Sequence, residues 1–226
     1  MINLRKVLSP LEFLVSIIPT FVKNLYVSQF IVYVFLLYLE FKNLNDELVK
    51  IQLADGKDNS ATKQRMVCIR QRHELLCLSG KCFNRGFSAQ ILLIIALDFV
   101  VFVVNLYFWY VKFVDEHFKR GTGYVIHTTA LGIFSLYVLA HIVTVSGVCA
   151  LTKKEAARSL DLCLKIGFLH DRNVSNEINL FVQQIEHWDF GFDAMEFFKI
   201  DFTLIYSIIR SATMFLLIFI QLDGTN

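Results

Sequence analysis

Apolar residues in this chain come in long blocks rather than in the short alternating runs of a soluble domain. Four blocks exceed the roughly 20 residues that a helix needs to cross a bilayer. They cover Phe13–Leu39, Phe87–Val111, Tyr124–Leu151 and Phe202–Leu222. Pro19 lies inside the first block and is expected to kink or end the helix there. The pattern predicts an all-α, polytopic membrane protein with about four transmembrane helices.

The two longer segments between the blocks have a helical periodicity of their own. In the second of them, an apolar stripe follows the spacing i, i+3, i+4 and i+7 of an amphipathic helix. Its members are Ile178, Phe181, Val182 and Ile185. Ser175 or Asn176 is expected to cap the start of this helix. The membrane helices are therefore expected to continue into helical extensions outside the bilayer. We expect the stripe to pack between subunits, although packing within its own chain fits equally well.

Basic residues are unevenly distributed between these segments. Residues 40–86 contain nine Lys or Arg and residues 152–199 contain six, whereas the short segment between the second and third blocks contains three. Cytoplasmic segments are enriched in Lys and Arg, so both longer segments are predicted to be cytoplasmic. The predicted regions are an extracellular start with the first transmembrane helix (1–39), a cytoplasmic helical segment (40–86), two transmembrane helices with a short extracellular loop (87–151), cytoplasmic helices (152–199), and a terminal transmembrane helix with a short tail (200–226). A glycan at the Asn173 sequon would overturn this orientation.

Several ionisable side chains fall inside the predicted spans, where they are costly and tend to face a bundle interior or water. Asp98 is expected to hydrogen-bond to a neighbouring helix, with contact to a ligand or ion as the alternative. His127 and His141 are about four helical turns apart, so they share one helix face but are too distant to bind one metal ion. Either histidine is a candidate for a ligand pocket. Lys23 is expected to extend towards the lipid headgroups if it lies near an interface.

Arg210 is the least expected charge, because it lies near the middle of the last block. Asp201 is nine residues earlier, or about 13 Å along a helix, and is not an obvious partner. We expect water in a cytoplasmic vestibule to solvate Arg210. The alternative is that the helix starts later and that Arg210 lies nearer the interface.

Composition excludes several classes of function. The hydrophobic fraction is 55% and the formal net charge is +2, so nothing indicates binding to nucleic acid. The five cysteines form no CxxC pair, and none has histidine partners at a metal-site spacing. Motifs for hydrolases, metalloproteases and phosphate-binding loops do not occur. The sequence therefore predicts a protein that is not an enzyme and that holds no metal ion or cofactor.

Three segments carry residues in a pattern typical of one known family. In residues 73–99 the matching positions are Leu75, Asn84, Phe87, Leu92 and Leu93. In residues 177–201 they are Phe181, Gln184, Ile185, Phe192, Ala194, Phe198 and Asp201. In the last helix, Met214-Phe215 and Gln221-Leu222 flank five hydrophobic residues, where the family has Thr-Tyr and Gln-Phe. The chain thus resembles the insect gustatory receptors, within the seven-transmembrane insect chemoreceptor superfamily, over most of residues 27–222.

The resemblance implies more than the residue pattern alone. It covers helices four to seven of a seven-helix family whose members form tetrameric, ligand-gated cation channels in the plasma membrane of sensory neurons. It implies that residues 152–199 form a cytoplasmic anchor, with packing positions at Phe181, Ile185, Phe192 and Phe198. It implies that the last helix lines a pore, with candidate positions at Arg210, Phe215, Ile218 and Gln221. The implied partners are a small-molecule tastant, membrane lipid, and related subunits in a homo- or hetero-tetramer.

Alternatives to a complete taste receptor remain open at this stage. Because helices one to three of the family have no counterpart, the chain is expected to be either a truncated receptor or a fragment that lacks much of the sensing end. A non-conducting partner of such a channel is a second possibility. Odorant receptors of the same superfamily are a third. A four-helix transporter or membrane enzyme lacks any recognisable site.

Overall fold

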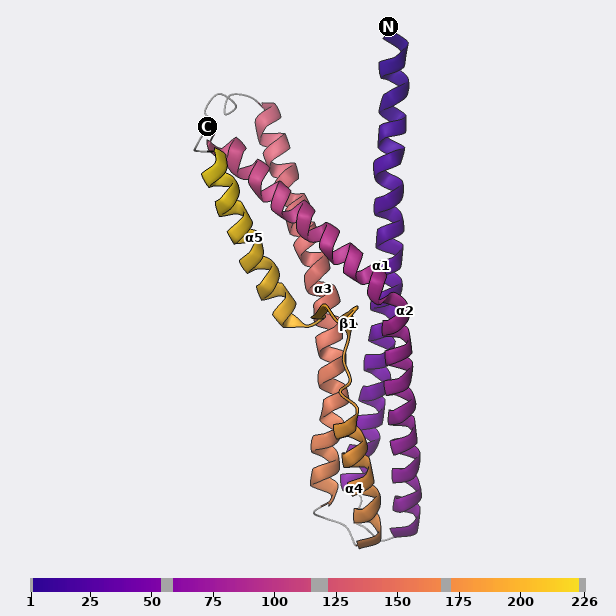
Figure 1. Ribbon diagram of the computed structural model, residues 1–226. Coiled ribbons are helices and arrows are strands. Elements are labelled where there is room, and N and C mark those ends of the chain that lie inside the picture. Colours follow the sequence, from indigo (N-terminus) through magenta and orange to yellow (C-terminus); the bar gives the residue numbers. More distant parts are fainter. Residues whose placement is uncertain (1, 54–58, 115–121, 168–171, 224–226) are drawn as a thin grey trace.

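The computed structural model describes the backbone of residues 2–53, 59–114, 122–167 and 172–223, and side chains within these ranges from Ile18 onward, except at positions 59, 113–114, 122–125, 127, 172–173 and 223. The elements are α1 (Ile2–Leu53), α2 (Asn59–Val114), α3 (Thr122–Gly167), α4 (Arg172–His187), β1 (Asp193–Ala194), β2 (Phe198–Lys199) and α5 (Phe202–Asp223) (Figure 1). The three long helices run side by side, with α4 beside their lower ends and α5 beside the upper parts of α2 and α3.

The prediction of an all-α, polytopic membrane protein is confirmed. Helices α1, α2, α3 and α5 are each long and apolar enough to cross a membrane. The three long helices have 52, 56 and 46 residues, which correspond to roughly 70–85 Å at 1.5 Å per residue. They therefore exceed the ~30 Å hydrocarbon core and continue beyond it as helical extensions. The side of the membrane on which these extensions lie stays a prediction.

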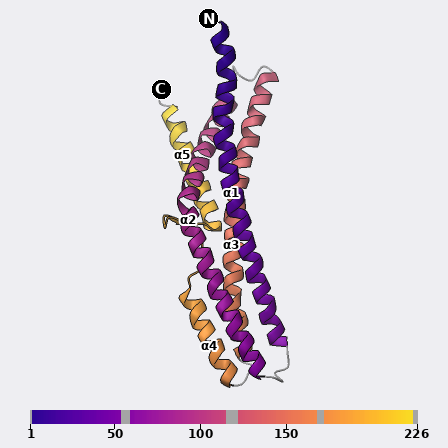
Figure 2. The ribbon, with the colours of Figure 1, turned by 90° about the vertical axis from the view of Figure 1, so that its right-hand side faces the viewer.

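Three local expectations were wrong. Helix α1 does not end at Pro19 but continues through it to Leu53 (Figure 2), whereas a kink at Pro19 stays a prediction. Helices in a membrane tolerate proline, because neighbouring groups satisfy the freed backbone atoms. Helix α4 begins at Arg172, so Ser175 and Asn176 lie within it rather than at its cap. Residues 188–199, predicted to belong with the cytoplasmic helices of residues 152–199, are not helical and contain a two-stranded antiparallel hairpin that pairs Asp193 with Lys199.

The lower ends of the helices form a closed apolar interior, here called the lower bundle (residues 40–53, 59–86, 152–167 and 172–187). Its buried side chains include Leu44, Leu48, Met66, Ile166, Ile178 and Phe181. Asn45 is completely buried between α1 and α3, where its amide donates to the Glu155 backbone oxygen at 2.8 Å and accepts from Ser159 at 2.7 Å. A buried polar group with its hydrogen bonds made fixes the register of the helices that it joins.

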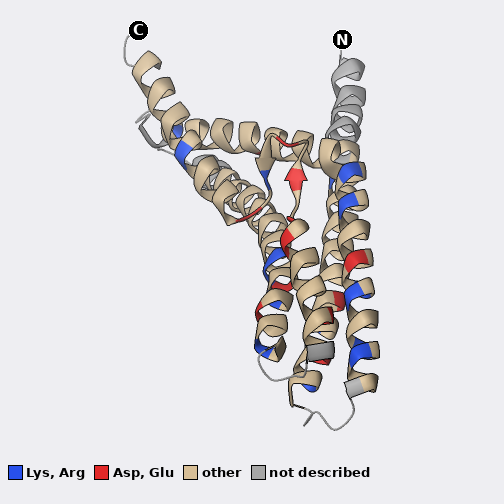
Figure 3. Ribbon diagram, turned by 60° about the horizontal axis from the view of Figure 1, so that its bottom comes forward, with Lys and Arg blue, Asp and Glu red and all other residues tan. Residues whose placement is uncertain are grey.

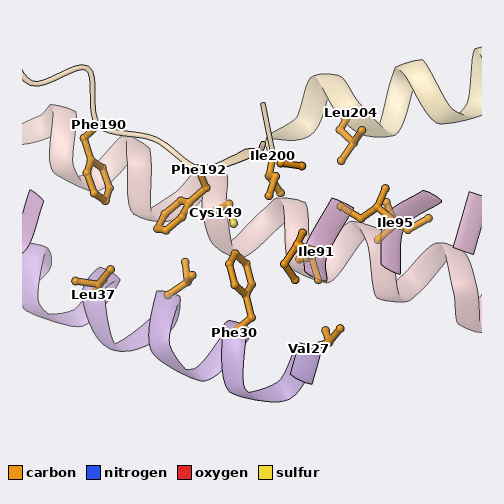
Figure 4. Packing of buried hydrophobic residues seen from close by; sticks show 14 of the residues in the cluster. Val27, Phe30, Leu37, Ile91, Ile95, Cys149, Phe190, Phe192, Ile200 and Leu204 are labelled. Carbon is orange, nitrogen blue, oxygen red and sulfur yellow. The ribbon is translucent and has the colours of Figure 1, made fainter. Parts of the chain in front are cut away.

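A second apolar cluster lies around the hairpin, where α1, α2 and α3 meet the start of α5. Phe30 of α1 packs against Phe192, and Ile200 and Leu204 cover Ile95 of α2 and Cys149 of α3 (Figure 4). Above this cluster burial becomes sparse, and only 17% of the apolar window of α5 is buried. Lys, Arg, Asp and Glu residues gather along the lower bundle, and few lie on the upper parts of α2 and α5 (Figure 3). A surface that is apolar and uncharged at this level is what a lipid environment requires.

Candidate functional site

A cluster of three charged or ionisable side chains joins the three long helices within their apolar upper parts. Asp98 of α2 accepts a bond from Lys23 of α1, with 2.7 Å between Nζ and Oδ1. Its other carboxylate oxygen lies 2.7 Å from Nδ1 of His141 on α3. The Asp98 side chain is only 4% exposed. These three residues are called the Asp98 cluster. Within it, the buried Asp98 carboxylate is paired with both Lys23 and His141, as an ionisable group inside a membrane span requires.

Aromatic and amide groups surround the Asp98 cluster. The Tyr137 ring stacks on His141 one turn away, and Lys23 Nζ lies 5.9 Å from the centre of the same ring. The Tyr137 hydroxyl donates to Asn24 Oδ1 at 2.7 Å. Nε2 of His141 is buried and has no hydrogen-bond partner within the described residues. The arrangement fixes α1 against α2 and α3, since removing one partner would leave a buried charge uncompensated.

Helix α5 presents two contrasting faces. Leu204, Ile208 and Ala212 are buried towards the rest of the chain, and Phe215 continues this side with its ring 6.0 Å from that of Phe99 on α2. The opposite side, here called the outer face, is exposed. It consists of Tyr206, Arg210, Thr213, Leu217 and Gln221. These positions follow a spacing of three or four residues, which keeps them on one side of a helix.

The start of α5 is capped and attached to the hairpin. Asp201 Oδ1 accepts from the Thr203 backbone N–H at 2.9 Å, which is the bond that an N-cap carboxylate supplies. The hydrogen bonds from Thr203 hold the pKa of the Asp201 carboxyl below its usual range. Two residues separate β2 from α5, so the first turn of α5 is held in the position that the hairpin sets.

Comparison with known proteins identifies the family to which this chain belongs. The model of the family described as 7tm chemosensory receptor matches residues 6–226. The chain belongs to this chemosensory receptor family. It is similar to the putative gustatory receptor 2a of Drosophila melanogaster, with 25% identity over 181 residues that cover 71% of this chain and 42% of the relative.

Two further relatives from Drosophila melanogaster are also gustatory receptors. The putative gustatory receptor 28b is 25% identical and the gustatory receptor for bitter taste 66a is 26% identical. Each match covers 68% of this chain, but 33% of the first relative and 29% of the second. The resemblance to insect gustatory receptors is thus confirmed, and the receptor chain spans less than half the length of these curated relatives.

The structure brings together two of the three predicted ligand-pocket residues of this chain. Asp98 and His141 bind each other, as the expectation of a hydrogen bond to a neighbouring helix foresaw. The side chain of His127 lies outside the described residues. Lys23 is bound to Asp98 instead of extending towards lipid headgroups, because an ion pair with a buried carboxylate offsets the charge at that depth. The sequence showed that Lys23, Asp98 and His141 lie in separate apolar blocks, but not that they contact one another.

Of the four predicted pore positions, Arg210 and Gln221 lie on the outer face and Phe215 does not. At roughly 100° per residue, Phe215 is about 140° from Arg210 around the helix axis, and it faces α2. Ile218 lies between the two sides and is 41% exposed. Arg210 makes no ion pair or hydrogen bond with any described residue. Tyr206, Thr213 and Leu217 were missed, although the i, i+3, i+4 spacing from Arg210 would have found them.

The four predicted anchor positions pack within their own chain. Phe181 is completely buried in the lower bundle, with its ring 5.2 Å from that of His73. Ile185 and Phe192 are also buried, and Phe198 is half-buried. The α4 stripe is therefore buried against α2 and α3, which is the second of the two packing expectations, and an anchoring role between subunits stays a prediction.

The described residues contain no group of three or more His, Cys, Asp or Glu side chains that could hold a metal ion. Cys77, Cys149 and Cys163 are buried in the apolar clusters, and Cys68 and Cys82 are exposed. The buried thiols act there as small apolar side chains. The Asp98 cluster and the outer face of α5 are thus the two features with functional potential.

Proposed function

We propose that this chain is part of a taste receptor that works as a ligand-gated cation channel in the plasma membrane of sensory neurons. The observation that carries the proposal is the outer face of α5. An apolar helix that leaves Tyr206, Arg210 and Gln221 uncovered needs water or another subunit beside it. Four copies of α5 arranged around an axis would supply both, with polar groups facing a conducting path.

The pore positions in this proposal follow the geometry of α5. Arg210, Thr213 and Gln221 supply polar groups along the path, and Leu217 supplies an apolar constriction between them. Phe215 supports the wall from behind through Phe99, and Ile218 borders it. Arg210 would lower the local concentration of cations near the entrance to the path, because like charges repel over distances shorter than the Debye length.

The subunits would be copies of this chain or related receptor chains, and a small-molecule tastant would open the path. We propose that the chain conducts together with a full-length related subunit. The test is expression of this chain alone, of a complete gustatory receptor alone, and of both together, with recording of tastant-evoked currents. The proposal predicts that Arg210→Gln in this chain changes the cation selectivity of the mixed channel. Currents that are identical with and without this chain would contradict the proposal.

A second candidate function is that of a non-conducting partner. The observation that favours it is that the Asp98 carboxylate binds both Lys23 and His141. Asp98 and His141 therefore offer few free polar atoms to a tastant. In that case the chain would bind a complete subunit and alter its abundance without entering the pore. Co-purification with unchanged selectivity for both wild type and Arg210→Gln would support this second function.

A further inference from the structure

The connection between α4 and α5 is fixed to α2 at one point. Asn84 of α2 is 8% exposed, and its side-chain amide donates from Nδ2 to Asp193 Oδ2 at 3.1 Å. Its Oδ1 accepts from the Asp193 backbone N–H at 3.3 Å. The second carboxylate oxygen of Asp193 accepts from the Glu196 backbone N–H at 2.9 Å. The amide donor and acceptor of Asn84 and both oxygens of Asp193 are therefore engaged.

The surface of α2 beside Asn84 is shaped for this connection. Gly80 lies one turn earlier, and a Cβ atom there would come 2.5 Å from Cε2 of Phe190. Lys81 places its ammonium group 4.2 Å from the centre of the Trp188 ring. The residues that follow α4 are thus packed along one side of α2 before they reach the hairpin, and any larger side chain at Gly80 would displace them.

The hairpin transmits this fixed position to α5. Asp193 pairs with Lys199 and Ala194 with Phe198, and the Ile200 N–H donates to the Phe192 oxygen at 2.9 Å. Met195 and Glu196 form the tip with φ values of 52° and 62°. Such values are costly for residues other than glycine, and they persist only where surrounding contacts determine the backbone. The bond from the Glu196 N–H to Asp193 is one such contact, so the Asn84–Asp193 pair and the hairpin tip support each other.

We propose that Asn84 and Asp193 form a latch that positions the base of α5 on α2. When the latch is closed, the inner face of α5 is seated against Ile95 and Phe99 of α2. When it opens, α5 is free to change its angle to α2. Helix α2 also carries Asp98, about 21 Å along its axis from Asn84. It therefore links the Asp98 cluster to the base of α5. The role of the latch in gating rests on the proposed function, whereas its role in seating α5 does not.

The test exploits the chemistry of the pair. Asn84→Asp places a carboxylate against that of Asp193 and is expected to open the latch. Two like charges in contact repel each other, and neither carboxylate can donate a hydrogen bond. Asp193→Asn leaves two amides that can still form one bond and is expected to have a smaller effect. The double variant Asn84→Asp/Asp193→Asn exchanges the two groups and is expected to restore the seating.

Seating is measured by thiol crosslinking in the full chain in membranes. Phe99→Cys and Phe215→Cys replace two rings whose centres are 6.0 Å apart, and a short bifunctional thiol reagent joins them. Peptide mass spectrometry distinguishes this product from products of the native cysteines. The matched control combines Phe99→Cys with Arg210→Cys, which lies on the outer face. Asn84→Asp should lower the yield of the first pair on the order of tenfold, as expected for an unsatisfied buried polar group.

The double variant should recover most of that yield, and Gly80→Ala should lower it independently by displacing Phe190. The proposal is overturned if Asn84→Asp leaves the yield unchanged, or if the double variant yields no more product than Asn84→Asp alone. Recovery by the exchanged pair cannot arise from general misfolding. Crosslinking requires no current, so a chain that fails to conduct would refute the proposed channel without affecting this result.

Discussion

The lower bundle and the upper parts of the helices differ in how completely their apolar side chains are buried within one chain. Below the hairpin, α4 buries its apolar stripe against α2 and α3, and Leu44, Phe181 and Ile166 are completely buried. Above the hairpin, α5 buries only one side, and large apolar residues such as Tyr206 and Met214 are 75% and 66% exposed. Apolar packing holds the lower part together, whereas the Asp98 cluster joins the helices of the upper part.

This difference indicates where further molecules are needed. A soluble bundle with a closed apolar interior gains little from another subunit, since its hydrophobic surface is already removed from water. The upper helices keep wide apolar surfaces that lipid can cover, and an outer face of α5 with a charge that lipid covers poorly. The surfaces left for lipid or for another subunit therefore lie on the upper part of the chain.

Truncating the buried stripe of α4 should have the largest effect. Phe181→Ala removes a completely buried ring that contacts His73 and should destabilise the chain by about 3–5 kcal/mol. A thermal melt in detergent should show a decrease in Tm of about 6–20 °C. Leu180→Ala is the control, because Leu180 is 50% exposed on the same helix. Equal losses for both variants would mean that the stripe is not the packing face.

Removing the charge of Asp98 should destabilise the upper part by a smaller amount. Asp98→Asn leaves Lys23 without its counter-charge and should cost about 2–3 kcal/mol. The double variant Lys23→Met/Asp98→Leu should recover most of this loss, because apolar residues of similar volume replace a buried ion pair at little cost. Detergent melts of the three proteins give the comparison. A double variant less stable than Asp98→Asn would show that these charges contribute through contacts other than each other.

Removing the cap of α5 tests the junction between the two parts. Asp201→Ala should cost about 1 kcal/mol, whereas Asp201→Asn keeps an oxygen that accepts from Thr203 and should cost less. The pKa of Asp201 is lowered in the folded chain, so the stabilisation that depends on its charge is present above about pH 4 and is lost as pH falls below it. Melts at pH 6 and pH 3 should therefore differ less for Asp201→Ala than for wild type. An unchanged difference would remove Asp201 from this role.

Truncation on the outer face should have the smallest effect on a single chain. Leu217 is 55% exposed, so Leu217→Ala should change the stability of the isolated chain by less than about 0.5 kcal/mol. The same variant should weaken assembly if subunits meet along α5, which sedimentation in detergent would reveal. A large loss of stability without any change in assembly would show that the outer face packs within the chain.

The sequence predicted four helices long and apolar enough to cross a membrane, because apolar blocks are local patterns. It could not predict that Lys23, Asp98 and His141 meet, since these residues come from three helices and their partners depend on how the helices are aligned. The hairpin was missed because each strand has only two residues, too few for an alternating pattern. The partner of the α4 stripe was left open because an apolar stripe has the same spacing whether it faces its own chain or another.

The most direct test of the proposed pore is cysteine accessibility along α5 in cells that express the chain with a complete related subunit. Exposed Cys68 and Cys82 are first replaced by serine. Cysteines at Arg210, Thr213 and Leu217 should react with a charged, membrane-impermeant thiol reagent and alter the current, whereas cysteines at Leu204, Ile208 and Ala212 should not. The opposite pattern, or equal reactivity on both sides of α5, would contradict the assignment of the outer face as the wall of a conducting path.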